Sequence, residues 1–180
     1  MIVEGRRPPP PTIARLAAWA SGPGAYTLGR LTGARYATFL GLRDAAERAL
    51  RRGKLEKTQR LAQELLDLAP RFSRDWNYGN AVHHGHRLLG EVALRRGDVV
   101  RVREELLAAG RTPGSPQLNS FGPNMSLAKA LLARGEREIV LEYFALCGAF
   151  WKYDIQGSLP AWTAAVRERR MPDFRGNLRY

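Results

Sequence analysis

The residues best suited to chemistry in this sequence are three clustered histidines, His83, His84 and His86. On a helix only His83 and His86 would share a face, because adjacent residues diverge by about 100°. Two imidazoles on one face could bind a metal together with a nearby carboxylate. However, the chain has no other histidine and a single thiol, Cys147. A structural role is therefore favoured over a polar ligand site and over a metal site, and no metal or cofactor is predicted.

Two polar inserts carry further side chains that could bind a ligand. Residues 75–80 and 112–124 are rich in asparagine, glycine and proline. Asparagine is a preferred N-cap, so helix capping is the first interpretation. The alternative is a shared polar pocket near His84, a small-ligand or metal site that could support an enzyme. Its members would be Trp76, Asn77, Asn80, His83, Asn119, Ser120 and Asn124.

Nucleophile and phosphate motifs are missing from the sequence. It contains no Gly-x-Ser-x-Gly, no Gly-rich phosphate loop and no His-Glu-x-x-His. These absences favour a non-catalytic protein, and no catalytic residue is predicted.

The elements that must position these residues repeat along the chain. Residues 49–54, 93–98 and 131–136 each end an apolar periodic stretch with Arg-Gly and a polar residue. Another helical pattern follows each of them. We expect each of these glycines to adopt the left-handed conformation that ends one helix and lets the next fold back. They are Gly53, Gly97 and Gly135.

The spacing around the three glycines is constant, and it predicts which positions face inward. Seven residues before them lie the small residues Ala46, Gly90 and Ala128. Five, nine and twelve residues after them lie positions on one face of the second helix. These positions are Thr58, Val102, Val140, Ala62, Leu106, Phe144, Leu65, Ala109 and Cys147. We therefore predict an all-α fold of about three helical hairpins.

This pattern resembles the tetratricopeptide repeat, and the resemblance covers about residues 34–152. It implies two antiparallel helices per unit, with the first helices lining a concave surface. The glycines stand 44 and 38 residues apart, so the units depart from the regular 34-residue period. The strings at 75–80, 114–124 and 171–174 also look like a group of bacterial repeat proteins of unassigned function. That likeness implies a bacterial source and carries over no active-site residue.

The repeat domain is predicted to span residues 34–157. Residues 1–33 read as a Pro/Gly-rich leader, with a short helix at 13–20 and a loop at 21–33. In the segment 158–180, Ser158 is expected to cap a helix over about 159–170 that covers the open end of the stack, followed by a basic tail. The sequence shows neither a signal peptide nor the roughly 18 apolar residues of a membrane span. A cytoplasmic protein is therefore expected.

The formal net charge of +12 favours acidic partners. The expected concave surface would present a set that is basic on balance: Arg43, Glu47, Arg51, His84, Arg87, Glu91, Arg95 and Lys129. An ordinary solvated surface is the alternative interpretation. Nucleic acid is less favoured, because no run of five basic residues and no basic-aromatic interleaving occurs. The predicted function is a helical repeat module that binds a protein or an acidic peptide segment.

Overall fold

The computed structural model describes residues 25–178, and none of them lies in a strand. The all-α prediction is confirmed for this part of the chain. The helices are α2 (Ala25–Thr32), α3 (Arg35–Arg51), α4 (Leu55–Leu68), η1 (Ala69–Phe72), α5 (Tyr78–Arg96), α6 (Val99–Gly110), α7 (Pro116–Phe121), α8 (Ser126–Leu132), α9 (Arg137–Phe150), α10 (Ser158–Arg167) and η2 (Arg175–Leu178).

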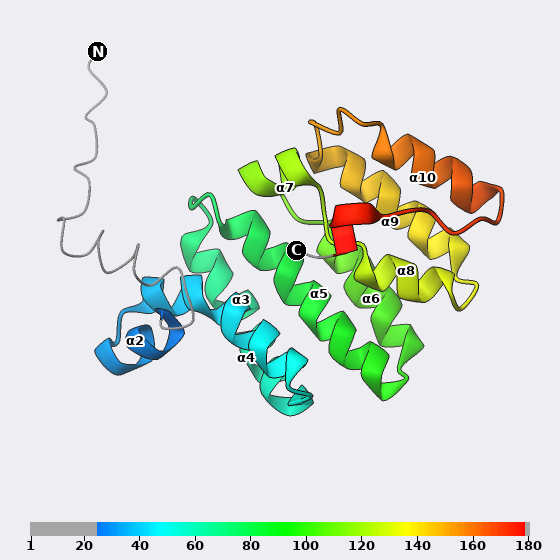
Figure 1. Ribbon diagram of the computed structural model, residues 1–180. Coiled ribbons are helices and arrows are strands. Elements are labelled where there is room, and N and C mark those ends of the chain that lie inside the picture. The colour runs from blue at the N-terminus through cyan, green and yellow to red at the C-terminus, as the bar shows by residue number, and fades with distance from the viewer. Residues whose placement is uncertain (1–24, 179–180) are drawn as a thin grey trace, which may run out of the picture.

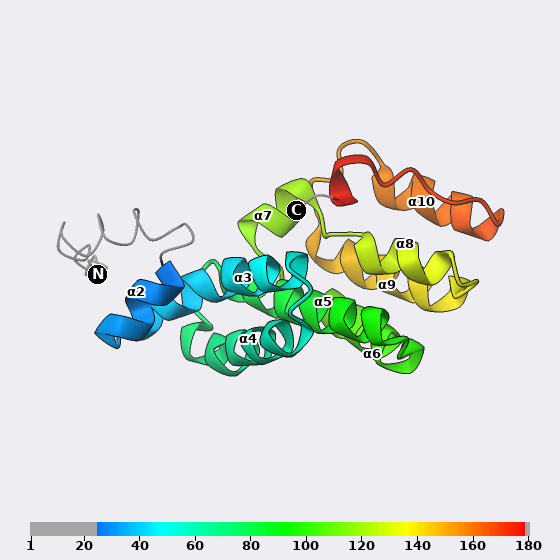
Figure 2. The same cartoon turned by 60° about the horizontal axis from the view of Figure 1, so that its bottom comes forward.

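Three helical hairpins form the body of the part that the structure describes (Figure 1). They are α3 with α4, α5 with α6, and α8 with α9. The turns contain Gly53, Gly97 and Gly135, whose φ angles are +69°, +78° and +84°. This left-handed conformation lets the chain reverse without a Cβ clash, so the predicted role of these glycines is confirmed. The first helices α3, α5 and α8 form one layer, and α4, α6 and α9 form the other (Figure 2).

The positions predicted to face inward are buried in all three hairpins. Ala46 and Ala128 have no exposed surface, and neither do Thr58, Val102 and Val140. At Gly90, a Cβ would lie 2.5 Å from Cδ1 of Leu127, so α5 approaches α8 closely there. The period of the hydrophobic pattern therefore identified the packed faces correctly.

Two apolar clusters make up the core. Leu42, Leu61 and Leu88 belong to the cluster built from α3, α4 and α5. Leu106 and Tyr143 belong to the cluster built from α6, α8, α9 and α10, to which Ala93 of α5 also belongs. Helix α5 contributes residues to both, so it is the central element of the molecule.

The prediction of a loop at 21–33 is wrong for residues 25–32, which form helix α2. The loop prediction rested on several glycines, among them Gly29 and Gly33. Gly29 lies inside the helix, where a Cβ would be 2.4 Å from the backbone nitrogen of Thr38. Gly29 thus allows α2 to lie close against α3, and it is not a loop residue. Gly33, at φ +69°, ends the helix. The short helix predicted at 13–20 lies outside the described residues.

The second insert contains helix α7. Ser115 caps it by accepting a hydrogen bond from the backbone N–H of Leu118, and Pro116 occupies the first turn. Helix α8 then has only seven residues, so the first helix of the third hairpin is short.

The last helix, α10, packs against α9, but its cap differs from the one predicted. Ser158 was expected to be the cap. Instead the carboxylate of Asp154 accepts from the backbone N–H groups of Ser158 (2.8 Å) and Leu159 (2.7 Å). Trp162 and Val166 are buried against the core. The helix ends at Arg167, three residues before the predicted end.

After α10 the chain folds back towards α7 and α8 (Figures 1 and 2). Asn177 anchors this tail: its Nδ2 donates to the carbonyls of Phe121 and Pro123, and its carbonyl accepts from the N–H of Met125. Within residues 25–178, no helix combines the length and the apolar character needed to cross a membrane.

Candidate functional site

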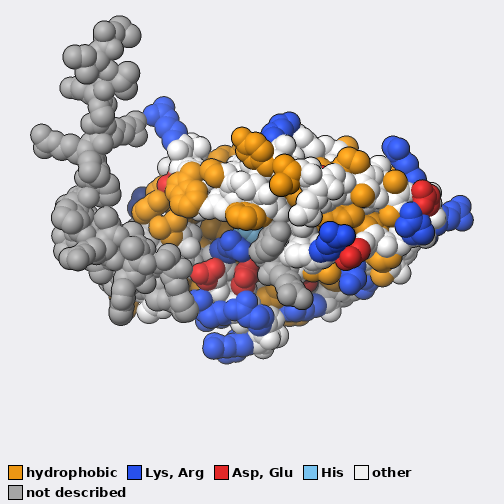
Figure 3. Space-filling view, turned by 45° about the horizontal axis from the view of Figure 1, so that its top comes forward, with side chains coloured by type: hydrophobic (Ala, Val, Ile, Leu, Met, Phe, Trp, Pro, Cys, Tyr) orange, Lys and Arg blue, Asp and Glu red, His pale blue; other side chains and the backbone are white. Residues whose placement is uncertain are grey.

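A polar cluster lies between α3 and α5, centred on the carboxylate of Glu47. Its other members are the guanidinium groups of Arg43, Arg51 and Arg87. Glu47 lies 3.2 Å from Nε of Arg43, 3.7 Å from Nη1 of Arg51 and 2.7 Å from Nη2 of Arg87. Three cations thus surround one anion, which leaves an excess of positive charge. Figure 3 shows acidic and basic side chains side by side on one face of the molecule.

Two residues that were predicted to line an open surface are buried instead. Arg87 is 8% exposed and His84 is 5% exposed. Both lie on α5, which neighbouring helices cover on either side. Burial lowers the pKa of His84 well below its ordinary value. Burial also lowers the pKa of Arg87, and the carboxylate of Glu47 opposes that shift.

Arg87 and His84 also carry atoms without a hydrogen-bond partner. Within the described part of the chain, Nε of Arg87 and Nδ1 of His84 are buried and unpaired. A buried polar atom without a partner is costly and uncommon. Arg87 therefore keeps one N–H donor of its guanidinium unused inside the protein.

The remaining residues of the predicted groove lie on α5 and α8. Glu91 accepts a hydrogen bond from the hydroxyl of Ser126 at 2.7 Å, which joins α5 to α8. Arg95 is exposed, and its Nη1 donates to the carbonyl of Leu50 at 2.7 Å. Lys129 is exposed on α8. The structure thus joins α3 to α5 and α5 to α8 through polar contacts on the face formed by α3, α5 and α8, which we call the first-helix face.

His83 has a structural role that both of its ring nitrogens serve. Nε2 accepts from the backbone N–H of Asn124 at 3.3 Å, so Nδ1 carries the proton and donates to the carbonyl of Ala109 at 3.2 Å. Burial lowers its pKa to about 3, which keeps the ring neutral. His83 therefore has no nitrogen free to share a metal with His86. Residues 25–178 contain no group of three or more His, Cys, Asp or Glu residues placed to hold a metal ion.

The neutral state of His83 predicts that acid destabilises the protein. In the unfolded chain the imidazole binds a proton below about pH 6.5, whereas in the folded protein it does so only near pH 3. The unfolded state therefore binds more protons in this range, and stability falls as the pH drops. From pH 7 to pH 5 His83 should account for a loss of about 2 kcal/mol.

Urea titrations of the wild type and of His83→Gln at both pH values would measure this contribution. The variant is expected to be less stable at pH 7, because it loses two buried hydrogen bonds, but to depend less on pH. If both proteins lost the same free energy of unfolding, His83 would not be the titrating group.

The spacing suggested that His86 pairs with His83, but His86 contacts Glu105 instead. Its Nδ1 lies 2.7 Å from Oε2 of Glu105, and Oε1 of the same carboxylate lies 2.6 Å from Nη2 of Arg101. Glu105 is only 2% exposed. The sequence analysis missed this buried acid, although its position three residues after Val102 places it on the inward face of α6.

The asparagines of the proposed polar pocket bind other protein groups. Asn80 donates to Oε1 of Gln117 and accepts from the hydroxyl of Ser115, which joins α5 to α7. Asn119 accepts from the backbone N–H of Lys152. Asn124 accepts from the N–H of Ser126, the first residue of α8, but it is not the N-cap: that position is Met125, which has no side-chain cap.

The other three residues of the proposed pocket, apart from His83, do not come together in one site. Asn77 begins α5 without a side-chain cap, so capping is not found there. Trp76 is 57% exposed in the preceding turn. Ser120 lies instead at the edge of a separate hollow of about 1030 Å³ beside α7 and α10. No hydrogen bond or ring contact joins His84 to Asn119 within the described chain, so the structure does not bring the full set together.

Comparisons with protein-family models, curated proteins and solved structures find no match for this chain. Its function must therefore be inferred from its own side chains. The first-helix face offers clustered guanidinium groups, which suit the binding of carboxylates.

Proposed function

We propose that the protein is a tetratricopeptide-like binding module that takes an acidic protein or peptide segment on its first-helix face. The observation that carries the proposal is the convergence of Arg43, Arg51 and Arg87 on the single carboxylate of Glu47. Guanidinium groups recognise carboxylates through paired hydrogen bonds. A partner carboxylate would supply the anionic charge that the cluster lacks.

The repeat assignment is supported by the recurrence of one local arrangement. Each hairpin has a left-handed glycine in its turn and a buried small residue seven positions earlier. A stack of such hairpins presents an extended surface, which is the usual binding surface of repeat proteins. The resemblance to the tetratricopeptide repeat is thus part of this proposal.

The distribution of charge favours a peptide over nucleic acid. Glu47 and Glu91 interrupt the basic side chains of the first-helix face, so its potential is uneven. A nucleic-acid backbone carries regular negative charge and suits a continuous basic strip. A peptide with spaced carboxylates fits the alternation better, because complementary charges also fix its register.

Reversing two accessible cations should test the first-helix face. Arg95 and Lys129 are exposed, so Arg95→Glu with Lys129→Glu should leave folding largely intact, apart from the bond of Arg95 to Leu50. We expect a labelled peptide of alternating glutamate and alanine to bind about tenfold more weakly to this variant. Fluorescence anisotropy at low salt would measure the affinity.

The matched control reverses two exposed arginines elsewhere. Arg60 lies on α4 and Arg167 on α10, and both are exposed. Reversing this pair changes the net charge by the same amount, so it should lower the affinity much less. Equal losses in both variants would show that only overall charge attracts the peptide. Tighter binding of a single-stranded oligonucleotide than of the peptide would favour the nucleic-acid alternative.

A further inference from the structure

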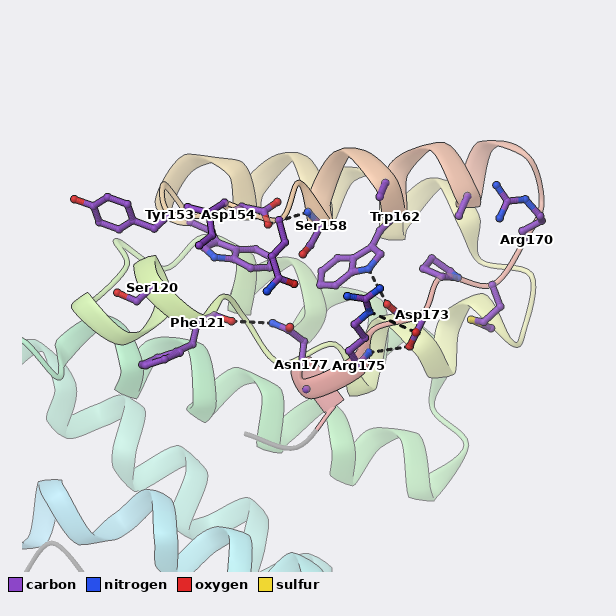
Figure 4. A pocket seen from close by; sticks show the side chains of 18 residues that line it. Ser120, Phe121, Tyr153, Asp154, Ser158, Trp162, Arg170, Asp173, Arg175 and Asn177 are labelled. Atoms are coloured by element: carbon purple, nitrogen blue, oxygen red, sulfur yellow. Dashed lines mark hydrogen bonds and ion pairs between the residues drawn. The ribbon is translucent and has the colours of Figure 1, made fainter.

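A hollow whose lining includes no residue of the Glu47 cluster lies at the C-terminal end of the molecule. This hollow, of about 1030 Å³, is enclosed by α7, the 151–157 segment, α10 and the tail at 170–177 (Figure 4). Trp151 and Trp162 line it and are 7% and 6% exposed, with ring centroids 5.7 Å apart. Its size falls near the upper end of the range for ligand pockets, and aromatic side chains are typical of their walls.

The lip of the hollow is unusually apolar for a surface. Four large side chains from three segments are exposed there: Phe121 (63%), Tyr153 (62%), Ile155 (91%) and Met171 (47%). Figure 4 shows Phe121 and Tyr153 at the same end of the hollow. Grouped exposed apolar residues mark interaction sites more often than scattered ones do.

The charged residues of the hollow already have partners. The carboxylate of Asp154 accepts from two N–H groups of α10. Asp173 lies 3.6 Å from Nε of Arg175, and Arg170 pairs with Glu168. A ligand for this hollow should therefore be uncharged, in contrast to a ligand for the Glu47 cluster.

One donor in the wall has no acceptor. Nε1 of Trp151 is buried and unpaired among the described residues, whereas Nε1 of Trp162 donates to the carbonyl of Asp173 at 3.0 Å. The Trp151 ring is held against Gly122, where a Cβ would lie 2.5 Å from Cζ2. Buried indole N–H groups normally find a partner, and a ligand carbonyl would provide one after a small tilt of the ring.

We propose that this hollow is a second binding site, which takes an aromatic side chain from an uncharged peptide segment. The hollow would receive the ring, and a peptide carbonyl would accept from Trp151. A small molecule confined to the hollow would leave Ile155 and Tyr153 in water, whereas a peptide would cover this lip as well. The charged residues around the hollow already have partners, so a segment without charge suits it.

The test uses a pentapeptide with capped ends, a central phenylalanine and alanines elsewhere. In ¹⁵N NMR titrations of the full chain we expect shifts of the Trp151 indole N–H and of the 153–155 amides. A pentapeptide made only of alanine should bind at least tenfold more weakly than the one with phenylalanine. The affinity should change less than twofold between low and high salt, since no ion pair forms.

Two substitutions on α10 provide a matched pair. Ala161 and Ala164 are both exposed, but only Ala161 lines the hollow. Ala161→Trp should fill the hollow and abolish binding, whereas Ala164→Trp should bind like the wild type. Trp151→Phe keeps an aromatic ring without the N–H, and should bind about two- to tenfold more weakly.

Several outcomes would overturn the proposal. Equal binding of the two pentapeptides would remove the role of the aromatic ring, and equal loss in both α10 variants would place the site elsewhere. Binding of N-acetyl-phenylalanine amide as tight as that of the pentapeptide would show a small-molecule pocket. Self-association of the protein that Ala161→Trp abolishes would show that a second copy occupies the hollow.

Discussion

Gly79→Ala is expected to destabilise the protein by about 3 kcal/mol, although it adds only one methyl group. A Cβ at this position would lie 1.7 Å from the carbonyl oxygen of Gly114 and 2.4 Å from its carbonyl carbon. Both are backbone atoms, so no change of side-chain rotamer can relieve the overlap. Moving α5 away would also stretch the bond from the Thr112 hydroxyl to the carbonyl of Gly79, which is 2.7 Å long.

Urea denaturation of Gly79→Ala should be compared with that of Gly148→Ala. Gly148 is exposed within α9, and a Cβ there has no atom within 4 Å. Alanine at Gly148 should therefore raise the free energy of unfolding by about 0.5–1 kcal/mol, because it favours the helix. Similar midpoints for the two variants would show that α5 does not contact the 112–116 segment this closely.

Glu47→Ala is expected to cost about 3 kcal/mol, because it leaves the buried guanidinium of Arg87 without its carboxylate partner. Arg87 is 8% exposed, and its Nη2 lies 2.7 Å from Glu47. Adding Arg87→Met to this variant removes the isolated charge and keeps most of the apolar packing. The double variant should therefore be more stable than Glu47→Ala alone.

Glu64→Ala is the control for this prediction, measured by the same urea titration. The side chain of Glu64 is 28% exposed, close to the 22% of Glu47, but its partner Arg30 is 62% exposed. This exposed pair should contribute less than about 1 kcal/mol. If the two glutamate variants were equally stable, or if Arg87→Met gave no recovery, the buried charge would not be the cause.

The burial of Arg87 also changes which substitutions can probe binding. Its predicted position on an open surface implied that a charge reversal there would leave folding intact. In the structure, Arg87→Glu would bury a second carboxylate against Glu47 and close to Glu91. Such a variant should unfold more easily, so a loss of binding would say nothing about the first-helix face.

The sequence by itself determined the helical hairpins and their buried faces. The period of the apolar residues fixes which side of a helix is buried, and this depends only on neighbours three and four positions away. Gly53, Gly97 and Gly135 end their helices for an equally local reason, since a left-handed turn needs no distant partner. Gly79 and Gly29 could not be interpreted in this way, because they make contacts with other segments.

The tertiary structure alone decided which polar residues are buried and where the surface is open. Arg87 meets Glu47 across 40 positions, and His83 meets Asn124 across 41. The period of apolar residues along a helix does not predict these pairs. A buried charge or imidazole is tolerated only where a distant chain segment supplies its partner. The apolar hollow likewise forms only where α7, α10 and the returning tail meet. Local periodicity sets which face of a helix turns inward, whereas the pairing of polar groups depends on how the helices pack together.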